Sequence, residues 1–229
     1  MKARKQITAL AALFAAGALS AQAQVVITEV DAGGSAASYA ADWFEVQNIG
    51  SSTVDLSTWK MDDNSDNFSL AVALHTATLS GLNSTLSLSS GQTAVFLEDT
   101  SAASDTTLAA NFTTAWFGAS VPSSLNLVFY GGSGVGLSST ADAVNLFDGS
   151  GNPMAGVTFG ASTAGHTFDN AAGLNNTAIS QISQVGIDGA FTSDNGAEIG
   201  SPGVVPEPSS LALFGMGAAL LGMIHRRKK

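Results

Sequence analysis

Short runs in which apolar and polar residues alternate occupy much of the 229-residue chain. In TLSLSS, residues 85–90, Leu86 and Leu88 fall on one face of an extended chain, and Ser87 and Ser89 fall on the other. This period of two residues is typical of a half-buried β-strand. We expect six further strands, at residues 25–30, 42–50, 53–61, 93–99, 125–130 and 143–148.

Turn-forming residues separate nearly all of these segments. The clearest hairpin is AVNLFDGSGNPMAGVTF, residues 143–159, in which residues 148–153 supply the reversal. Helical periodicity is scarce: TTAWFGA, residues 113–119, suggests a short helix, and we find no window with an apolar stripe over several turns. Seven or eight short strands predict an all-β fold, an antiparallel β-sandwich with a core built from alternate side chains.

Large apolar residues in these strands are the expected core. Trp43 and Trp59 are expected to be core anchors, since a sandwich of this size needs large inward side chains. Adjacent residues of a regular strand face opposite sides, so either Leu146 or Phe147 should lie at a bulge or be partly exposed. The predicted core comprises Phe44, Val46, Leu56, Trp59, Phe96, Leu146 and Phe147.

The beginning of the chain is typical of a secretory signal peptide. Basic residues precede an apolar stretch from Ile7 to Leu19, and the small residues Ala21 and Ala23 follow it. We expect residues 1–23 to be removed after export. An uncleaved membrane anchor is the alternative, which the short apolar stretch disfavours.

The other end combines three features in order. Pro206, Glu207 and Pro208 hold an extended segment that suits recognition in an enzyme groove. The next apolar stretch, residues 209–224, would form a helix about 24 Å long, slightly short of the hydrocarbon core of a membrane. A basic cluster then predicts a stop to translocation with the body of the protein outside the membrane: Arg226, Arg227, Lys228 and Lys229.

The charge of the middle of the chain restricts its partners. Between residues 25 and 205, Lys60 is the only Lys or Arg against seventeen Asp and Glu, so this region carries a formal charge of −16. Such a surface repels phosphate backbones, and nucleic acid is excluded as an expected partner. The absence of cysteine excludes disulfides, thiolate metal sites and thiol catalysis.

One loop is a weak candidate for calcium. In DDNSDN, residues 62–67, Asp62, Asn64 and Asp66 have the spacing of the first three ligands of an EF-hand loop. Asn67 replaces the turn glycine and Ala73 replaces the bidentate glutamate, so any calcium needs ligands from elsewhere. A solvated acidic loop is the alternative. We expect no other cofactor.

Catalytic patterns are weak. There is no G-x-S-x-G elbow, and His75 and His166 occupy unremarkable positions in an apolar stretch and a loop. The acidic pairs at residues 62–66 and 98–99 would support glycoside hydrolysis only if a cleft held two carboxyl groups at a defined separation. We therefore expect a non-catalytic protein.

The C-terminal features resemble those of the PEP-CTERM proteins of Gram-negative bacteria. Pro206 to Pro208 match the motif, residues 211–224 the helix and residues 226–229 the basic end. The resemblance implies transient insertion in the inner membrane and processing by an exosortase, a transpeptidase-like membrane enzyme. It also implies delivery to the cell surface or the extracellular matrix.

The body is similar to the lamin tail domain, an immunoglobulin-like sandwich that also occurs in secreted bacterial proteins. The similarity rests on ITEV (27–30), DWFEVQNIG (42–50), VDLSTWKMDD (54–63), the hairpin noted above and the closing GSPG (200–203). It implies an immunoglobulin-like domain over residues 24–203, followed by a sorting segment over residues 204–229.

We accordingly expect an exported surface or matrix protein whose sandwich binds exopolysaccharide or another surface polymer. A calcium-dependent adhesion or protein-interaction module is the alternative, and a hydrolase is a third class.

Overall fold

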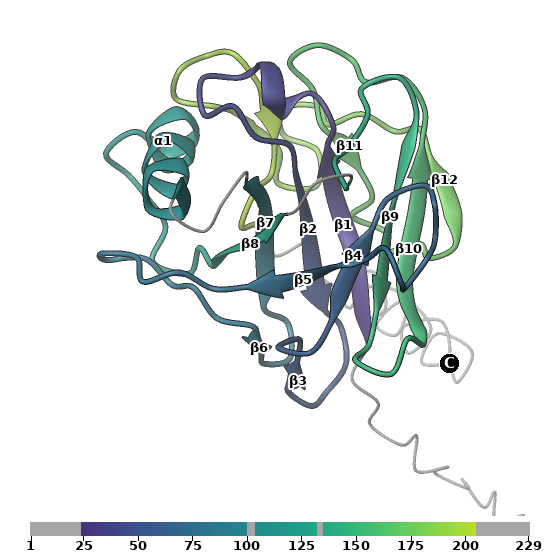
Figure 1. Ribbon diagram of the computed structural model, residues 1–229. Helices are drawn as coiled ribbons and strands as arrows, with labels where there is room; N and C mark the ends of the chain where they lie inside the picture. The colour runs from purple at the N-terminus through teal and green to yellow at the C-terminus, as the bar shows by residue number, and fades with distance from the viewer. Residues whose placement is uncertain (1–23, 100–103, 132–134, 205–229) are drawn as a thin grey trace, which may run out of the picture.

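The computed structural model describes residues 24–99, 104–131 and 135–204 (Figure 1). The predicted signal peptide and residues 205–229 of the predicted sorting segment lie outside them. The described strands are β1 (Val25–Asp31), β2 (Trp43–Asn48), β3 (Val54–Asp55), β4 (Lys60–Asp62), β5 (Val72–His75), β6 (Ser87–Leu88), β7 (Thr93–Asp99), β8 (Leu127–Gly131), β9 (Asp142–Phe147), β10 (Pro153–Phe159), β11 (Phe168–Asp169), β12 (Thr177–Ile179), β13 (Phe191–Thr192) and β14 (Ile199–Gly200). The helices are a 3-10 turn, η1 (Gly34–Ala36), and α1 (Asp105–Phe117).

Ten strands form one hydrogen-bonded sheet in the order β11-β1-β2-β7-β8-β5-β4-β9-β10-β12. The sheet folds over on itself at β5, which pairs with β8 on one side and with β4 on the other. Most neighbouring strands are antiparallel, while β7–β8 and β10–β12 are parallel. The result is the mostly antiparallel, immunoglobulin-like sandwich that the sequence predicts.

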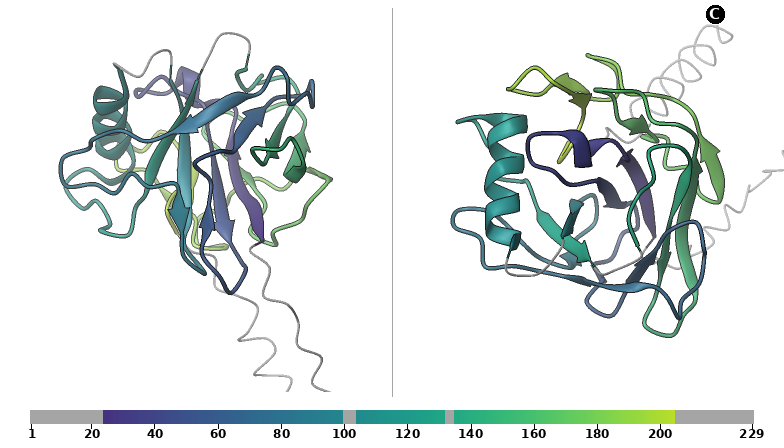
Figure 2. Two further views of the ribbon diagram at one scale, coloured as in Figure 1. Left: turned by 60° about the horizontal axis from the view of Figure 1, so that its bottom comes forward. Right: turned by 45° about the horizontal axis from the view of Figure 1, so that its top comes forward.

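Strands β1, β2, β7 and β8 form a central layer that is covered on both faces. Strands β9 and β10 lie on one side of this layer and α1 lies on the other, as Figure 2 shows. Since both faces are covered, every residue of β2 is buried. Alternate residues of β2 therefore serve two different cores.

The inner core lies between the two halves of the folded sheet. It includes Phe44, Val46, Leu56, Trp59, Met61, Phe96, Tyr130, Val144 and Leu146. The helix core lies between α1 and the central layer and includes Tyr39, Trp43, Val95, Leu97, Phe112, Trp116 and Phe129. The two predicted anchors, Trp43 and Trp59, are both buried, but in different cores.

Helix α1 corrects the expectation that helical periodicity is scarce. It spans 13 residues, and its apolar residues Leu108, Ala109, Phe112, Ala115 and Trp116 recur at helical spacing on the face that is buried. Two of these five residues are alanines, which made the stripe hard to recognise. The helix buries this stripe against the central layer.

Most of the predicted strand segments are confirmed, but of residues 85–90 only Ser87 and Leu88 form a strand, β6, and one other segment is divided. Residues 93–99 form β7 as expected, and the hairpin forms from β9 and β10. The segment 53–61 divides into β3 and β4, because a turn closed by the hydrogen bond from the Trp59 N–H to the Leu56 carbonyl interrupts it.

Leu146 and Phe147 are both buried, contrary to the expectation for a regular strand. Leu146 belongs to the inner core, whereas Phe147 is covered from the opposite face by Phe68, with ring centroids 5.9 Å apart. The irregularity lies in the partner strand β10, where the register shifts between Pro153 and Ala155. The expected bulge is therefore on the opposite strand.

Candidate functional site

Buried carboxyl groups are the most unusual feature of the sandwich. Ten acidic residues are buried: Glu29, Asp31, Asp42, Glu45, Asp62, Asp99, Asp105, Asp142, Asp169 and Glu198. No Lys or Arg forms a salt bridge in the described part of the chain. The Nζ atom of Lys60 lies 4.7 Å from the centre of the Phe68 ring. These carboxyl groups therefore depend on hydrogen bonds, on protonation or on bound cations.

Two of them, Glu29 and Glu45, hold the end of the domain in place; we call this arrangement the closing clamp. Glu29 accepts hydrogen bonds from the Ser201 N–H at 2.8 Å and from the Ser201 hydroxyl at 2.9 Å. Glu45 accepts one from the Gly203 N–H at 2.6 Å. The closing residues 201–203 are thus fixed to β1 and β2.

The carboxylates of the clamp also accept hydrogen bonds from two threonine hydroxyls. The Thr167 hydroxyl donates to Glu29 at 2.5 Å and the Thr28 hydroxyl donates to Glu45 at 2.8 Å. Burial raises the pKa of Glu29 to about 7. Burial also raises the pKa of Glu45 well above its ordinary value, and repulsion from the nearby Glu29 raises it further. In the sequence, both glutamates stand out only because they fall in segments similar to the lamin tail domain. Only the fold shows that both contact residues 201–203.

A second buried group joins Asp31 and Glu198 through Tyr39. The Tyr39 hydroxyl lies 3.0 Å from Asp31 and 2.9 Å from Glu198, and it accepts a hydrogen bond from the Trp43 indole N–H. A single hydroxyl proton serves only one of the two carboxylates. Burial raises the pKa of both carboxyl groups, and repulsion from Glu198 raises that of Asp31 further.

The acidic loop at residues 62–67 does not gather its three predicted ligands at one point. Asp62 is fully buried beneath the loop, where one oxygen accepts hydrogen bonds from the Ser65 hydroxyl and the Asn67 N–H, each at 2.6 Å. Its other oxygen has no hydrogen-bond partner within the described residues. Asn64 and Asp66 instead lie at the exposed side of the loop.

Asn64 and Asp66 line a hollow that we call the loop pocket, with a volume of about 480 Å³. Asp142 fixes one wall: its carboxylate accepts hydrogen bonds from the backbone N–H groups of Asn64, Ser138 and Ala143. The pocket is lined by Asn64, Asp66, Ala141, Asp142, Ala143, Asn145, Thr158 and Phe159.

The two histidines of the body have different surroundings. His166 has its Nδ1 2.9 Å from the Ser183 carbonyl, a local structural contact. His75 lies beside the buried Asp99 and Asp105. Neither histidine is notable in the sequence, because Asp99 and Asp105 reach His75 from other elements of the fold.

The predicted sorting residues lie outside the described residues: Pro206, Glu207, Pro208 and the basic cluster Arg226 to Lys229. Within the described ranges, no helix combines the length and the apolar character needed to cross a membrane.

Comparison with known families matches residues 18–161 to the lamin tail domain, which is more than half of the chain. The chain therefore belongs to the lamin tail domain family. Residues 204–229 match the PEP-CTERM protein-sorting motif, so the protein is exported and is processed by an exosortase at the membrane. Both families are of non-catalytic kinds. No curated protein matches the chain.

Proposed function

We propose that the chain is a non-catalytic surface or matrix component of a Gram-negative bacterium, and that its sandwich binds a neutral surface polysaccharide in the loop pocket. The observation that carries this proposal is the pocket itself. It combines the amides of Asn64 and Asn145 and the carboxylate of Asp66 with apolar walls. Amides donate and accept hydrogen bonds and carboxylates accept them, which suits paired sugar hydroxyls.

The charge of the body supports a neutral polymer. One lysine against seventeen acidic residues between residues 25 and 205 repels an anionic chain unless a divalent cation bridges the two. Asp66 and Asp142 also place negative charge directly at the pocket. A neutral polysaccharide avoids this repulsion.

The closing clamp supports the proposed division of the chain into a signal peptide (1–23), a sandwich (24–203) and a sorting segment (204–229). The clamp fixes residues 201–203, so folded structure extends to within a few residues of Pro206. The motif then follows the body directly. In this proposal the apolar tail inserts transiently in the inner membrane, and cleavage releases the acidic body to the surface or matrix.

Affinity electrophoresis of the full-length chain in detergent tests the polymer proposal. Gels containing dextran or hydroxyethyl cellulose supply neutral polymers, and gels containing alginate supply an anionic one. We expect retardation by a neutral polymer, and its loss in the double variant Asn64→Ala with Thr158→Ala. The matched control Ser87→Ala, an exposed serine of β6, should be retarded normally. Unchanged retardation of the double variant would refute the assignment of the pocket.

Mass spectrometry of surface-delivered protein tests the sorting proposal. We expect a C-terminus near the Pro206–Pro208 motif. Glu207→Ala should leave export intact and impair cleavage, while deletion of residues 226–229 should disturb retention in the membrane before cleavage. Surface-delivered molecules that still end at Lys229 would contradict processing.

A calcium-dependent adhesion module is the second candidate. It is favoured by the unpartnered buried oxygen of Asp62 directly beneath the loop that carries Asn64 and Asp66. Repeating the electrophoresis with a chelator separates the two. Retardation that is lost with chelator, restored by Ca²⁺ and abolished by Asp66→Asn would replace the first proposal with this one.

Hydrolysis is not part of the proposal. In the loop pocket, the oxygens of Asp142 already accept hydrogen bonds from three backbone N–H groups, so this carboxylate is occupied as a structural acceptor. Glycoside hydrolysis needs two free carboxyl groups, one as acid and one as base or nucleophile, and among the residues that line the pocket only Asp66 offers one. Release of reducing sugar from any of the test polymers would overturn this view.

A further inference from the structure

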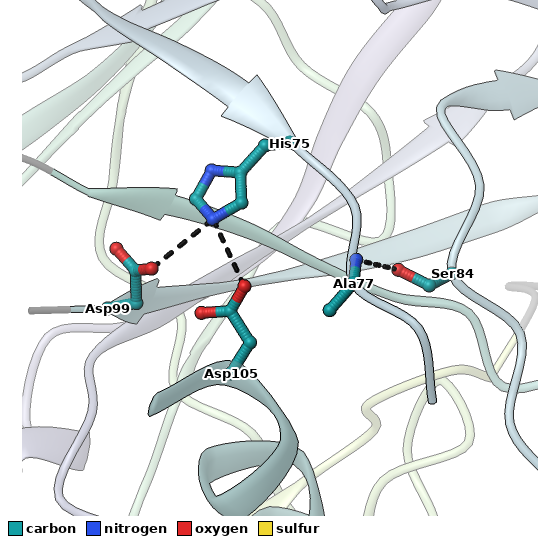
Figure 3. A network of polar contacts seen from close by, with 5 residues as sticks. All are labelled: His75, Ala77, Ser84, Asp99 and Asp105. Atoms are coloured by element: carbon teal, nitrogen blue, oxygen red, sulfur yellow. Dashed lines mark hydrogen bonds and ion pairs between the residues drawn. The ribbon is translucent and has the colours of Figure 1, made fainter. Parts of the chain in front are cut away.

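Three side chains from different elements converge beside the helix core, and we call them the histidine cluster (Figure 3). His75 is the last residue of β5, Asp99 is the last residue of β7, and Asp105 is the first residue of α1. The Nε2 atom of His75 lies 3.2 Å from an oxygen of Asp99 and 3.3 Å from an oxygen of Asp105. This is the only group of three or more His, Cys, Asp or Glu side chains in the described ranges that is close enough to share a metal ion.

The two carboxyl groups of the cluster are buried, and three of its polar atoms have no hydrogen-bond partner among the described residues. The side chains of Asp99 and Asp105 are 4% and 3% exposed. The His75 Nε2, the Asp99 oxygen that faces it and one oxygen of Asp105 have no hydrogen-bond partner among the described residues. A buried carboxylate without a hydrogen-bond partner is costly, so an oxygen of this kind that faces a histidine nitrogen is suited to share a cation with it.

A protonated histidine alone does not satisfy this arrangement. One N–H at Nε2 can donate along one direction, and neither carboxylate meets it with hydrogen-bond geometry. Asp99 and Asp105 also repel each other, which contributes to a raised pKa of Asp105 that is mainly caused by burial. No Lys or Arg forms a salt bridge with either carboxylate in the described part of the chain.

A divalent cation fits both the distances and the charge. Two ligands of a tetrahedral zinc ion, each about 2.05 Å from the metal, are about 3.3 Å apart. The contacts of 3.2 and 3.3 Å from His75 to the two aspartates have this separation. A charge of +2 would neutralise both carboxylates at once.

We propose that His75, Asp99 and Asp105 form a site for a divalent transition-metal ion of the zinc class. The imidazole nitrogen selects against calcium and magnesium, which prefer oxygen ligands alone. Three protein ligands leave one coordination position open, as zinc sites allow.

The site lies close to solvent on the side of His75. The His75 side chain is 32% exposed. Asp99 also lines a neighbouring cavity of about 170 Å³, together with Glu98, Thr107 and Asn111. The His75 ring is held against Phe129, with centroids 5.8 Å apart. A bound metal would tie α1 to β5 and β7 and so hold the helix on the central layer.

Isothermal titration of the full-length chain, first stripped with EDTA, tests the proposal with Zn²⁺ and Ca²⁺ as probes. We expect one equivalent of Zn²⁺ to bind and no Ca²⁺ to compete for it. His75→Asn and Asp99→Asn should weaken Zn²⁺ binding by about tenfold or more. The matched controls His166→Asn and Asp55→Asn, which lie outside the cluster, should bind Zn²⁺ as the unsubstituted chain does.

Nitrogen-15 NMR of the histidine rings provides a readout that needs no variant to fold. Zn²⁺ should shift the Nε2 resonance of His75 and leave that of His166 unchanged. The proposal is overturned if the unsubstituted chain binds no Zn²⁺, if His75→Asn binds it with unchanged affinity, or if the His75 resonance does not respond. The polysaccharide assays are independent, because they address the loop pocket.

Discussion

The closing clamp and the histidine cluster are two groups of buried carboxylates in the same sandwich, and they differ in how their oxygens are satisfied. In the clamp, all four oxygens of Glu29 and Glu45 accept hydrogen bonds from the protein. In the cluster, oxygens of Asp99 and Asp105 have no such partner among the described residues. Buried carboxyl groups therefore have two different roles in this fold: those of the clamp fix the closing residues, and those of the cluster are placed to bind the proposed ion.

Removal of a clamp carboxylate should give the largest effect. Glu29→Ala leaves hydroxyl and N–H donors of Thr167 and Ser201 unsatisfied and opens a cavity. We expect it to lower the free energy of unfolding by about 4 kcal/mol. Urea denaturation measures this, with Glu29→Gln as a control that keeps an acceptor oxygen. A loss below about 1 kcal/mol would mean that the clamp does not hold the domain end.

The pH dependence of stability is the next effect. Burial raises the pKa of Glu29 from 4.5 to about 7. Between these values the folded protein keeps a proton that the unfolded chain has released, so stability falls as pH rises through this window. The penalty above pH 7 is about 3 kcal/mol from this group.

Urea denaturation at pH 5 and pH 8 checks this direction. The unsubstituted chain should be more stable at pH 5, since Glu45, Asp31 and Glu198 also have raised pKa values. Glu29→Gln should reduce the difference between the two pH values. Greater stability at pH 8 than at pH 5 would contradict protonated buried carboxyl groups.

The backbone of the clamp should be sensitive to a single methyl group. Gly203 has a φ of +73°, and a Cβ there would lie 2.7 Å from the Leu125 side chain. We expect Gly203→Ala to lower the free energy of unfolding by about 2 kcal/mol. Gly196→Ala is the matched control, since Gly196 has a φ of +72° and no neighbour within 4 Å of a Cβ. Equal melting temperatures of the two variants would mean that the Leu125 contact has no effect.

The smallest expected change in the free energy of unfolding is an increase, produced by Asp99→Asn. In chelator at pH 8, Asp99→Asn removes one of two adjacent carboxylates that lack a cation, so we expect stabilisation by about 1 kcal/mol. With Zn²⁺ present, the same variant should instead be the less stable protein. Destabilisation in chelator, similar to that of Glu29→Ala, would show that the cluster is a structural hydrogen-bonding group like the clamp.

The strands that were predictable from the sequence are those whose local pattern and packing agree. Residues 93–99 form β7, and residues 143–159 form the β9–β10 hairpin, because apolar content and turn residues specify them locally. Helix α1 was underestimated because Ala109 and Ala115 supply part of its buried stripe. The parallel pairing of β7 with β8 was not foreseen, since pairing depends on the path of the chain between the two strands.

The candidate sites were less predictable than the strands. The spacing of Asp62, Asn64 and Asp66 indicated a loop of interest, but burial separates Asp62 from the pocket that the other two line. His75 occupies an apolar segment with no neighbouring ligand in sequence. Its partners, Asp99 and Asp105, are more than twenty residues away along the chain.

The sequence by itself determined the features that depend on local pattern: β-strand periodicity, an acidic body and the family similarities of the body and of the C-terminal segment. The tertiary structure decided which acidic residues are buried and what each one meets. A carboxylate gains its role from donors and charges within a few ångströms, and only folding brings Glu29 to Ser201, or Asp99 and Asp105 to His75.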